Sequence, residues 1–134
     1  MTENENRCTV VKYWWEKANE SLQSAKREFD AGAYHFAINR IYYAAYYAVS
    51  ALLLKNKLSF KKHTGVRSAF HQEFIKTNIV DIQWGKAYDR FFEDRQEGDY
   101  VEVIDFEKEY VGSQIHLCEK FLEVLKPLII EGIM

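Results

Sequence analysis

The sequence predicts an all-α protein, an antiparallel up-down bundle of four to five helices. Three observations lead to this fold class. Apolar residues recur at alternating steps of three and four along most of the chain, which is the period of an amphipathic helix. One proline and six glycines among 134 residues disfavour a turn-rich β architecture. No segment shows the strict polar and apolar alternation of a half-buried strand.

The first helix is expected to follow a short arm. Residues 1–8 are polar and are predicted to form a loose N-terminal arm, with residues 9–134 as a single helical-bundle domain. From Val10 to Phe29 the apolar side chains follow one helical stripe. Gly32 then ends the helix, because glycine readily adopts the left-handed conformation of a helix cap.

The second helix, over residues 33–56, is expected to be central because apolar and aromatic side chains cover most of its circumference. Its tyrosines exceed what the core of one small bundle would use, which favours an interface; they are Tyr42, Tyr43, Tyr46 and Tyr47. Arg40 lies in the same helix and needs a partner if it is buried. The sequence predicts either an ion pair with an acid of the fourth helix (Asp89, Glu93 or Asp94) or a role at a site.

Three further helices complete the prediction. A short third helix is expected from an N-cap at Thr64 to about residue 77, because threonine is a favoured N-cap. A fourth is expected over residues 82–97, ended by Gly98, and a fifth over residues 105–126. Pro127 is expected to end or kink the fifth helix.

Strict up-down connectivity has a consequence for function. The loop after the second helix and the loop after the fourth should lie at the same end of the bundle. Lys62 and His63 are therefore expected near Arg95, Asp99 and Tyr100.

Composition excludes several classes of protein. A net charge of −2 gives no general attraction for nucleic acid, although a local basic cluster could receive RNA phosphates or an acidic partner. That cluster consists of Lys55, Lys57, Lys61, Lys62, His63 and Arg67. The sequence has no signal peptide, no apolar run long enough to span a membrane, and no metal or cofactor motif. We therefore expect a cytoplasmic protein with free thiols, no membrane contact, no cofactor and no metal.

The segment around Arg95 carries the most suggestive chemistry. An arginine beside a phenol and a carboxylate can hold a phosphate and orient a hydroxyl. The alternative is a salt bridge at a helix end with a packing tyrosine. His63 is a candidate general acid or base because imidazole titrates near neutral pH, the alternative being a hydrogen-bonding histidine without a catalytic role. The catalytic candidates are Arg95, Tyr100 and His63, and the binding candidates are Arg40, Tyr43, Lys62 and Asp99.

Several short motifs, in this order and spacing, resemble the HEPN superfamily (higher eukaryotes and prokaryotes nucleotide-binding), in particular its small stand-alone prokaryotic branch. They are Ala37-Ile-Asn-Arg40-Ile-Tyr42-Tyr43-Ala44-Ala-Tyr46, Lys62-His63-Thr-Gly65-Val66, Phe70-His-Gln-Glu-Phe74 and Arg95-Gln-Glu-Gly-Asp99-Tyr100. The resemblance covers about residues 10–126 and implies a four- or five-helix bundle that forms homodimers.

The resemblance also implies a function. Many HEPN proteins resemble toxins paired with a nucleotidyltransferase antitoxin, and many are metal-independent ribonucleases with an Arg-x4-6-His motif at the dimer interface. Carried over to this chain, the arginine of that motif is Arg95. The histidine position has no match, because Tyr100 stands there and the next histidine is His116.

Three hypotheses follow from the sequence. The first is a HEPN module of a toxin-antitoxin-type pair that acts with a nucleotidyltransferase partner and binds nucleotide or RNA at a dimer-associated site. The second is a metal-independent ribonuclease toxin in which Arg95, with Tyr100 or His63, positions RNA for attack by the ribose 2′-hydroxyl. The third is a non-catalytic dimeric helical adaptor.

Overall fold

The computed structural model describes residues 2–100 and 106–133, and every regular element in that part of the chain is a helix. In chain order the elements are α1 (Glu3–Asp30), α2 (Tyr34–Lys55), α3 (His63–Phe70), the π-helical turn η1 (His71–Ile75), α4 (Ile82–Tyr100) and α5 (Lys108–Ile130). The predicted all-α bundle is therefore confirmed.

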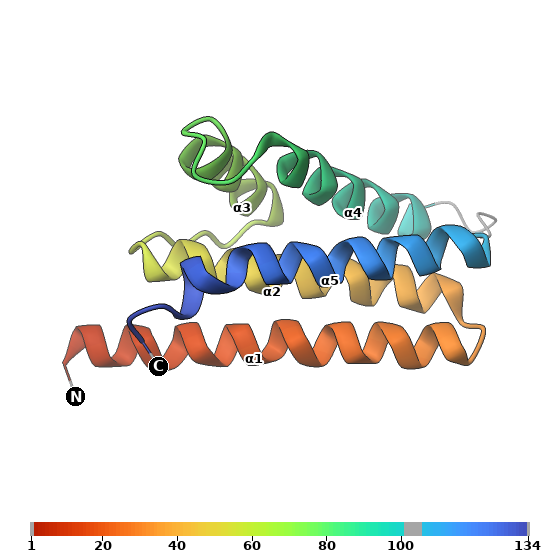
Figure 1. The fold of residues 1–134 in the computed structure, drawn as a ribbon, viewed down its shortest axis with the longest axis horizontal. Coiled ribbons are helices and arrows are strands. Elements are labelled where there is room, and N and C mark those ends of the chain that lie inside the picture. The colour runs from red at the N-terminus through yellow and green to blue at the C-terminus, as the bar shows by residue number, and fades with distance from the viewer. Residues whose placement is uncertain (1, 101–105, 134) are drawn as a thin grey trace.

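Four long helices alternate in direction, and the short α3 and η1 stand between the second and third of them. α2 and α5 lie in the middle of the molecule, α1 runs along one side of this pair, and α3 and α4 cover the other side (Figure 1). At one end of the bundle the Lys55 ammonium donates to the carbonyls of Leu128 (3.1 Å) and Glu131 (2.6 Å), so the last turns of α2 and α5 meet there. At the other end Tyr110 of α5 donates to Asp94 of α4.

This topology changes the reason why His63 comes close to Arg95. The last residues of α2 and the last residues of α4 lie at opposite ends of the bundle, so the expectation of a shared end was wrong (Figure 1). The expectation rested on strict up-down connectivity, in which the short helix predicted to end near residue 77 still counts as one full crossing of the bundle, whereas α3 has only eight residues. The connection after Lys55 folds back along α2 instead, and His63 bonds to Tyr42 in the first half of that helix.

The core is built around α2, as its composition predicts. Eleven of its residues are buried, and five of them are alanines, which allow neighbouring helices to approach closely. The buried alanines are Ala37, Ala44, Ala45, Ala48 and Ala51. Around them pack large side chains from every other helix, including Leu22, Phe70, Phe91 and Phe121. The small alanine side chains of α2 thus determine where α4 and α5 can pack. They thereby also determine the positions of the α4 and α5 residues that lie near the middle of α2.

The N-terminal segment differs from the expected loose arm, because α1 already begins at Glu3. Thr2 and Glu5 form a reciprocal capping box: the Thr2 hydroxyl accepts from the Glu5 amide, and the Glu5 carboxylate accepts from the Thr2 amide. This pair satisfies backbone donors that a helix start leaves open. The expected end of the helix is confirmed, since Gly32 has φ of +77° directly after the cap at Ala31.

Three boundaries in the second half of the chain were also predicted wrongly. α3 begins at His63 with Lys62 as its N-cap, two residues before the proposed cap at Thr64. α4 continues through Gly98 to Tyr100, because helix interiors tolerate a single glycine at a cost of about 1 kcal/mol. Pro127 lies inside α5, whose neighbouring residues Leu125 and Ile129 are fully buried and hold the last turn in place.

Gly85 allows α4 and η1 to pack closely, and this contact can be tested. A Cβ at position 85 would lie 2.9 Å from His71 Cε1 and 3.1 Å from Ile75 Cγ1, while a Cβ at Gly112 of α5 would meet Phe29 at an ordinary 3.4 Å. His71 cannot move freely because it bonds to Asp89. We expect Gly85→Ala to be less stable than Gly112→Ala by about 1–3 kcal/mol in urea unfolding, the usual cost of overpacking. Equal stability of the two variants would contradict this account.

Candidate functional site

The residues that carry the site come from three helices. α2 contributes Tyr42, Tyr43 and Tyr46, α3 contributes its first residue, His63, and α4 contributes Arg95 in its last two turns. Tyr42 touches all of the others: its ring packs against Tyr43, Tyr46 and His63, and the Arg95 guanidinium lies 5.6 Å from its centroid. The five side chains form one cluster, called the Arg95–His63 site below.

His63 is held in one orientation by two tyrosines. Its Nδ1 lies 2.9 Å from the Tyr42 hydroxyl, and its ring stacks on Tyr46 with a centroid distance of 4.2 Å. Burial raises the pKa of Tyr42 well above that of an ordinary phenol, so this hydroxyl keeps its proton and can donate to Nδ1. When Tyr42 donates, the proton of a neutral His63 sits on Nε2.

Arg95 lies against the aromatic faces of α2. Its Nη2 donates to the Tyr43 hydroxyl at 3.3 Å, and its guanidinium carbon lies 5.6 Å and 5.5 Å from the ring centroids of Tyr42 and Tyr43. A cation over an aromatic face is stabilised by the ring quadrupole, by roughly 0.5–2 kcal/mol depending on desolvation. The preceding residue, Asp94, is buried and accepts from Tyr110, which fixes the end of α4.

The electrostatics of the site set the protonation state of His63. Burial lowers the pKa of His63 first, and the positive charge of Arg95 lowers it further. The imidazole is therefore mostly neutral at pH 7. Behind it, burial also raises the pKa of Tyr46 and of the fully buried Tyr88, so the phenols around His63 stay uncharged. Arg95 is thus the permanent charge of the cluster.

This arrangement has a clear chemical capacity. A half-buried guanidinium presents a planar, permanently charged donor set that matches phosphate oxygens. The neighbouring tyrosine rings offer faces on which a nucleobase can stack. A neutral, oriented imidazole can accept or return a proton close to a bound phosphate. The site is suited to a phosphodiester or a nucleotide.

Comparison with known proteins identifies the family of the chain. The HEPN domain family matches residues 11–128 of the chain. A UPF0332 protein of Thermotoga maritima is 48% identical over 120 residues, which cover 90% of this chain and 91% of that protein. Two proteins of Methanocaldococcus jannaschii, each named "Putative toxin", are 37% and 32% identical; the matches cover 86% and 83% of this chain and 78% and 82% of theirs. The chain belongs to the HEPN family.

In this HEPN protein, only some of the site residues predicted from the sequence lie together in the structure. His63, Arg95 and Tyr43 come together, while Lys62 is exposed at the N-cap position of α3. The backbone of Asp99 and Tyr100 continues α4, but their side chains lie outside the described part of the structure.

The ion pair with α4 that was one of the two predictions for Arg40 is made by another arginine. The side chain of Arg40 is exposed, and Arg67 of α3 makes the contacts proposed for it with α4. Arg67 Nε lies 2.8 Å from the Asp89 carboxylate and its Nη2 lies 3.6 Å from Glu93, while its guanidinium lies over Phe92. Three members of the predicted basic cluster are therefore engaged in the fold: Arg67 with α4, Lys55 of α2 with the end of α5, and His63 with Tyr42.

Sequence reasoning missed two members of the site. Tyr42 and Tyr46 were interpreted as interface residues, yet they orient His63 from within the bundle. Their spacing of four residues places both on one helix face, which is the signal that could have linked them.

No helix in residues 2–100 and 106–133 is long and apolar enough to cross a membrane.

The lowered pKa of His63 predicts how stability depends on pH. The unfolded chain, with an ordinary histidine pKa of 6.5, binds a proton more readily than the folded one. The contribution of His63 to the free energy of unfolding is fully present above pH 6.5. It is lost as the pH falls from 6.5 toward the pKa of His63 in the folded protein. We expect the free energy of unfolding to fall less between pH 7 and pH 5 in His63→Gln than in wild type. An identical loss in both proteins would show that His63 is not perturbed.

Proposed function

We propose that this HEPN protein is the toxin-type member of a two-protein pair and binds RNA or a nucleotide through a phosphate at the Arg95–His63 site. The observation that carries the proposal is Arg95, which is held against two tyrosine rings and bonded to the Tyr43 hydroxyl. A guanidinium fixed in this way loses little further freedom when it binds phosphate bidentately. The names of the two Methanocaldococcus jannaschii relatives support the toxin-type role.

The partner is proposed to be a nucleotidyltransferase that acts as the antitoxin. The support is the family resemblance together with a site that would present a nucleotide or RNA close to α4. Expression of this chain alone is then expected to slow the growth of a bacterial host, and co-expression of the nucleotidyltransferase encoded beside it is expected to restore growth. Arg95→Ala should grow normally without the partner. Growth inhibition by Arg95→Ala equal to that of wild type would remove Arg95 from the proposal.

Phosphate recognition by Arg95 can be measured directly. Arg95→Lys keeps the charge but loses the planar fork, so we expect binding of a short oligoribonucleotide or a nucleotide to weaken at least about tenfold. Tyr43→Phe removes one hydrogen bond to Arg95 and should weaken binding by a smaller factor, about threefold to tenfold. Isothermal titration calorimetry at fixed salt measures both. Arg90→Lys, an exposed arginine on the same helix, is the matched control and should bind like wild type.

A second candidate function, metal-independent RNA cleavage, is favoured by one observation. The HEPN motif histidine is absent after Arg95, but His63 occupies a position beside Arg95 from a different helix and is mostly neutral at pH 7. In such a reaction the ribose 2′-oxygen attacks the adjacent phosphorus as His63 accepts its proton. The bond from phosphorus to the 5′-oxygen breaks, which leaves a 2′,3′-cyclic phosphate and a 5′-hydroxyl that takes up a proton.

Cleavage is tested with purified protein, labelled RNA and a metal chelator. The ribonuclease candidate predicts cyclic-phosphate products, unchanged by chelation, whose formation falls by at least about a hundredfold in His63→Gln. His116→Gln, an exposed histidine on α5, is the matched control. Absence of cleavage combined with Arg95-dependent binding would leave the binding function alone, and cleavage that persists in His63→Gln would contradict the role of His63.

The site is also proposed to lie at a homodimer interface. Beside it, Tyr43 and Tyr47 of α2 are half-buried, Trp14 of α1 stacks on Tyr47, and Tyr13 is 52% exposed. This continuous aromatic surface has the composition of an interface core. We expect a dimer in sedimentation experiments at tens of micromolar protein, and a shift toward monomer in Tyr13→Asp. A monomeric wild-type protein at that concentration would refute the interface.

A further inference from the structure

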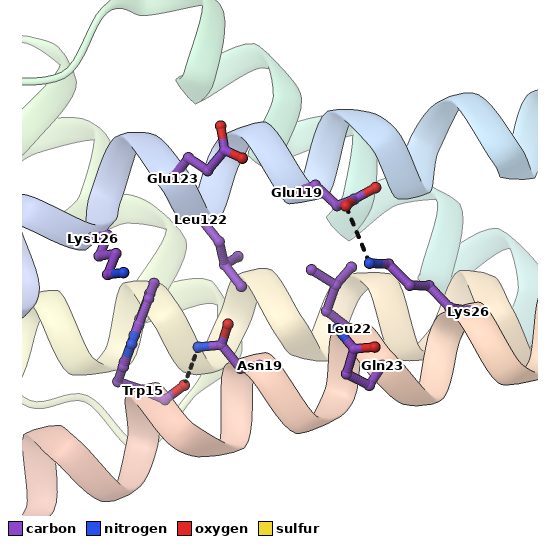
Figure 2. A pocket seen from close by; sticks show the side chains of 9 residues that line it. All are labelled: Trp15, Asn19, Leu22, Gln23, Lys26, Glu119, Leu122, Glu123 and Lys126. Atoms are coloured by element: carbon purple, nitrogen blue, oxygen red, sulfur yellow. Dashed lines mark hydrogen bonds and ion pairs between the residues drawn. The ribbon is translucent and has the colours of Figure 1, made fainter.

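A groove of about 320 Å³ lies between α1 and α5 and shares no residue with the Arg95–His63 site. Figure 2 shows the side chains that line it. Its floor is apolar, formed by Leu22 of α1 and Leu122 of α5, which are 5% and 3% exposed. The volume falls in the range of small-molecule sites, roughly 300–1,000 Å³. An apolar floor with polar side chains along its walls is the usual composition of such sites.

The groove is closed at both ends by defined side chains. At one end the Trp15 indole stands on edge, as Figure 2 shows, so that a ring face is turned along the groove. At the other end the ion pair between Lys26 and Glu119, at 3.1 Å, bridges α1 to α5. A second hollow of about 630 Å³ is also bordered by Trp15 and Asn19. The indole packs partly against the core and still borders both hollows, so part of it is available as a stacking surface.

One hydrogen-bonding group in the groove has a fixed direction. The Asn19 amide nitrogen donates to the Trp15 carbonyl at 2.9 Å, one turn back in α1. This bond turns the Asn19 side-chain oxygen away from the backbone and toward α5 (Figure 2). The groove thus offers an acceptor close to an aromatic face. A flat ring that stacks on Trp15 and carries an N–H group at its edge would satisfy both.

The charges of the groove favour a neutral ligand. Lys26 and Lys126 are balanced by Glu119 and Glu123, so its lining has no net attraction for a polyanion. This differs from the Arg95–His63 site, where the permanent charge is positive. Glu123 and Lys126, on the α5 side, supply an acceptor and a donor for hydroxyl groups.

We propose that this groove binds a purine nucleoside, with the base stacked on Trp15, a base N–H group donated to Asn19, and the ribose toward Glu123 and Lys126. A purine is favoured over a pyrimidine because its larger face covers more of the indole, and base stacking on aromatic side chains contributes substantially to binding. The proposal does not depend on the function of the Arg95–His63 site, because the two share no residue.

The test is a titration of the full-length protein with adenosine, followed by calorimetry and by the indole N–H signals of its three tryptophans in NMR. We expect a dissociation constant of roughly 0.05–1 mM, typical for a ligand of this size, and a shift of the Trp15 signal. Trp15→Leu should weaken binding at least about tenfold, and Trp15→Phe should restore part of it. Followed by the Trp15 signal, adenosine monophosphate should bind to this groove within about threefold of adenosine, since the net charge of the lining is zero.

Two variants keep the test decisive if Trp15→Leu fails to fold. Asn19→Ala changes only an exposed side chain and should weaken binding about threefold to tenfold through loss of the acceptor. Glu20→Ala, the exposed neighbour outside the groove, is the matched control, and Arg95→Lys should have no effect. The proposal is overturned if adenosine does not bind at millimolar concentration, if binding requires a phosphate, or if it persists unchanged in folded Asn19→Ala and Trp15→Phe proteins.

Discussion

A buried phenol must find a hydrogen-bond partner, and in this protein that requirement links the core to the site. Tyr42 has no exposed surface, because the alanines beside it bring α4 and α5 close to α2. An unpaired hydroxyl in such a place would cost roughly 1–3 kcal/mol. His63 Nδ1 lies 2.9 Å from this hydroxyl, and the chain after α2 returns to the first half of that helix, where α3 begins at His63.

The rest of the site follows from the same contact. With Tyr42 fixed, Phe92 of α4 packs edge-on against its ring at 5.8 Å, and Arg95, three residues later, reaches the rings of Tyr42 and Tyr43. Tyr46, one turn along α2, stacks on His63 from the other direction. The charge of Arg95 then acts on the imidazole and keeps its pKa low. The buried side chain of Tyr42 thereby helps to position His63, the candidate general base. Through Phe92 it also helps to position Arg95, the proposed phosphate ligand.

The helices could be predicted from the sequence, but their ends could not. Apolar periodicity identifies α1, α2 and α4 because packing of a long face dominates their stability. Local signals such as Thr64, Gly98 and Pro127 misplaced boundaries, since a single cap or breaker contributes only about 1–3 kcal/mol and does not by itself decide where a helix ends. The proximity of His63 and Arg95 was expected for the wrong reason. It depends on the short α3 and on the Tyr42 bond, neither of which has a periodic signature.

The partners of the arginines in ion pairs could not be predicted from the sequence either, because these contacts also depend on how the helices pack. Arg40 and Arg67 are both arginines on helices that face α4, and sequence alone does not say which one reaches Asp89. The structure gives that place to Arg67, whose side chain also covers Phe92, and leaves Arg40 exposed. The histidine of the HEPN motif is a second case in which neighbours in space could not be inferred from the order of residues in the sequence. This histidine is missing along the sequence after Arg95, yet an imidazole stands beside Arg95 in space because α3 delivers it from another part of the chain.

An NMR titration of the His63 imidazole shows whether Arg95 and His63 form one phosphate-binding site. In the free protein we expect a His63 pKa below the ordinary 6.5, because of burial and the charge of Arg95. A bound phosphodiester offsets that charge, so the pKa of His63 should rise on saturation with a dinucleotide, while that of the exposed His116 stays unchanged. A His63 pKa at or above 6.5 in the free protein, or one that does not move when the dinucleotide binds, would contradict such a site.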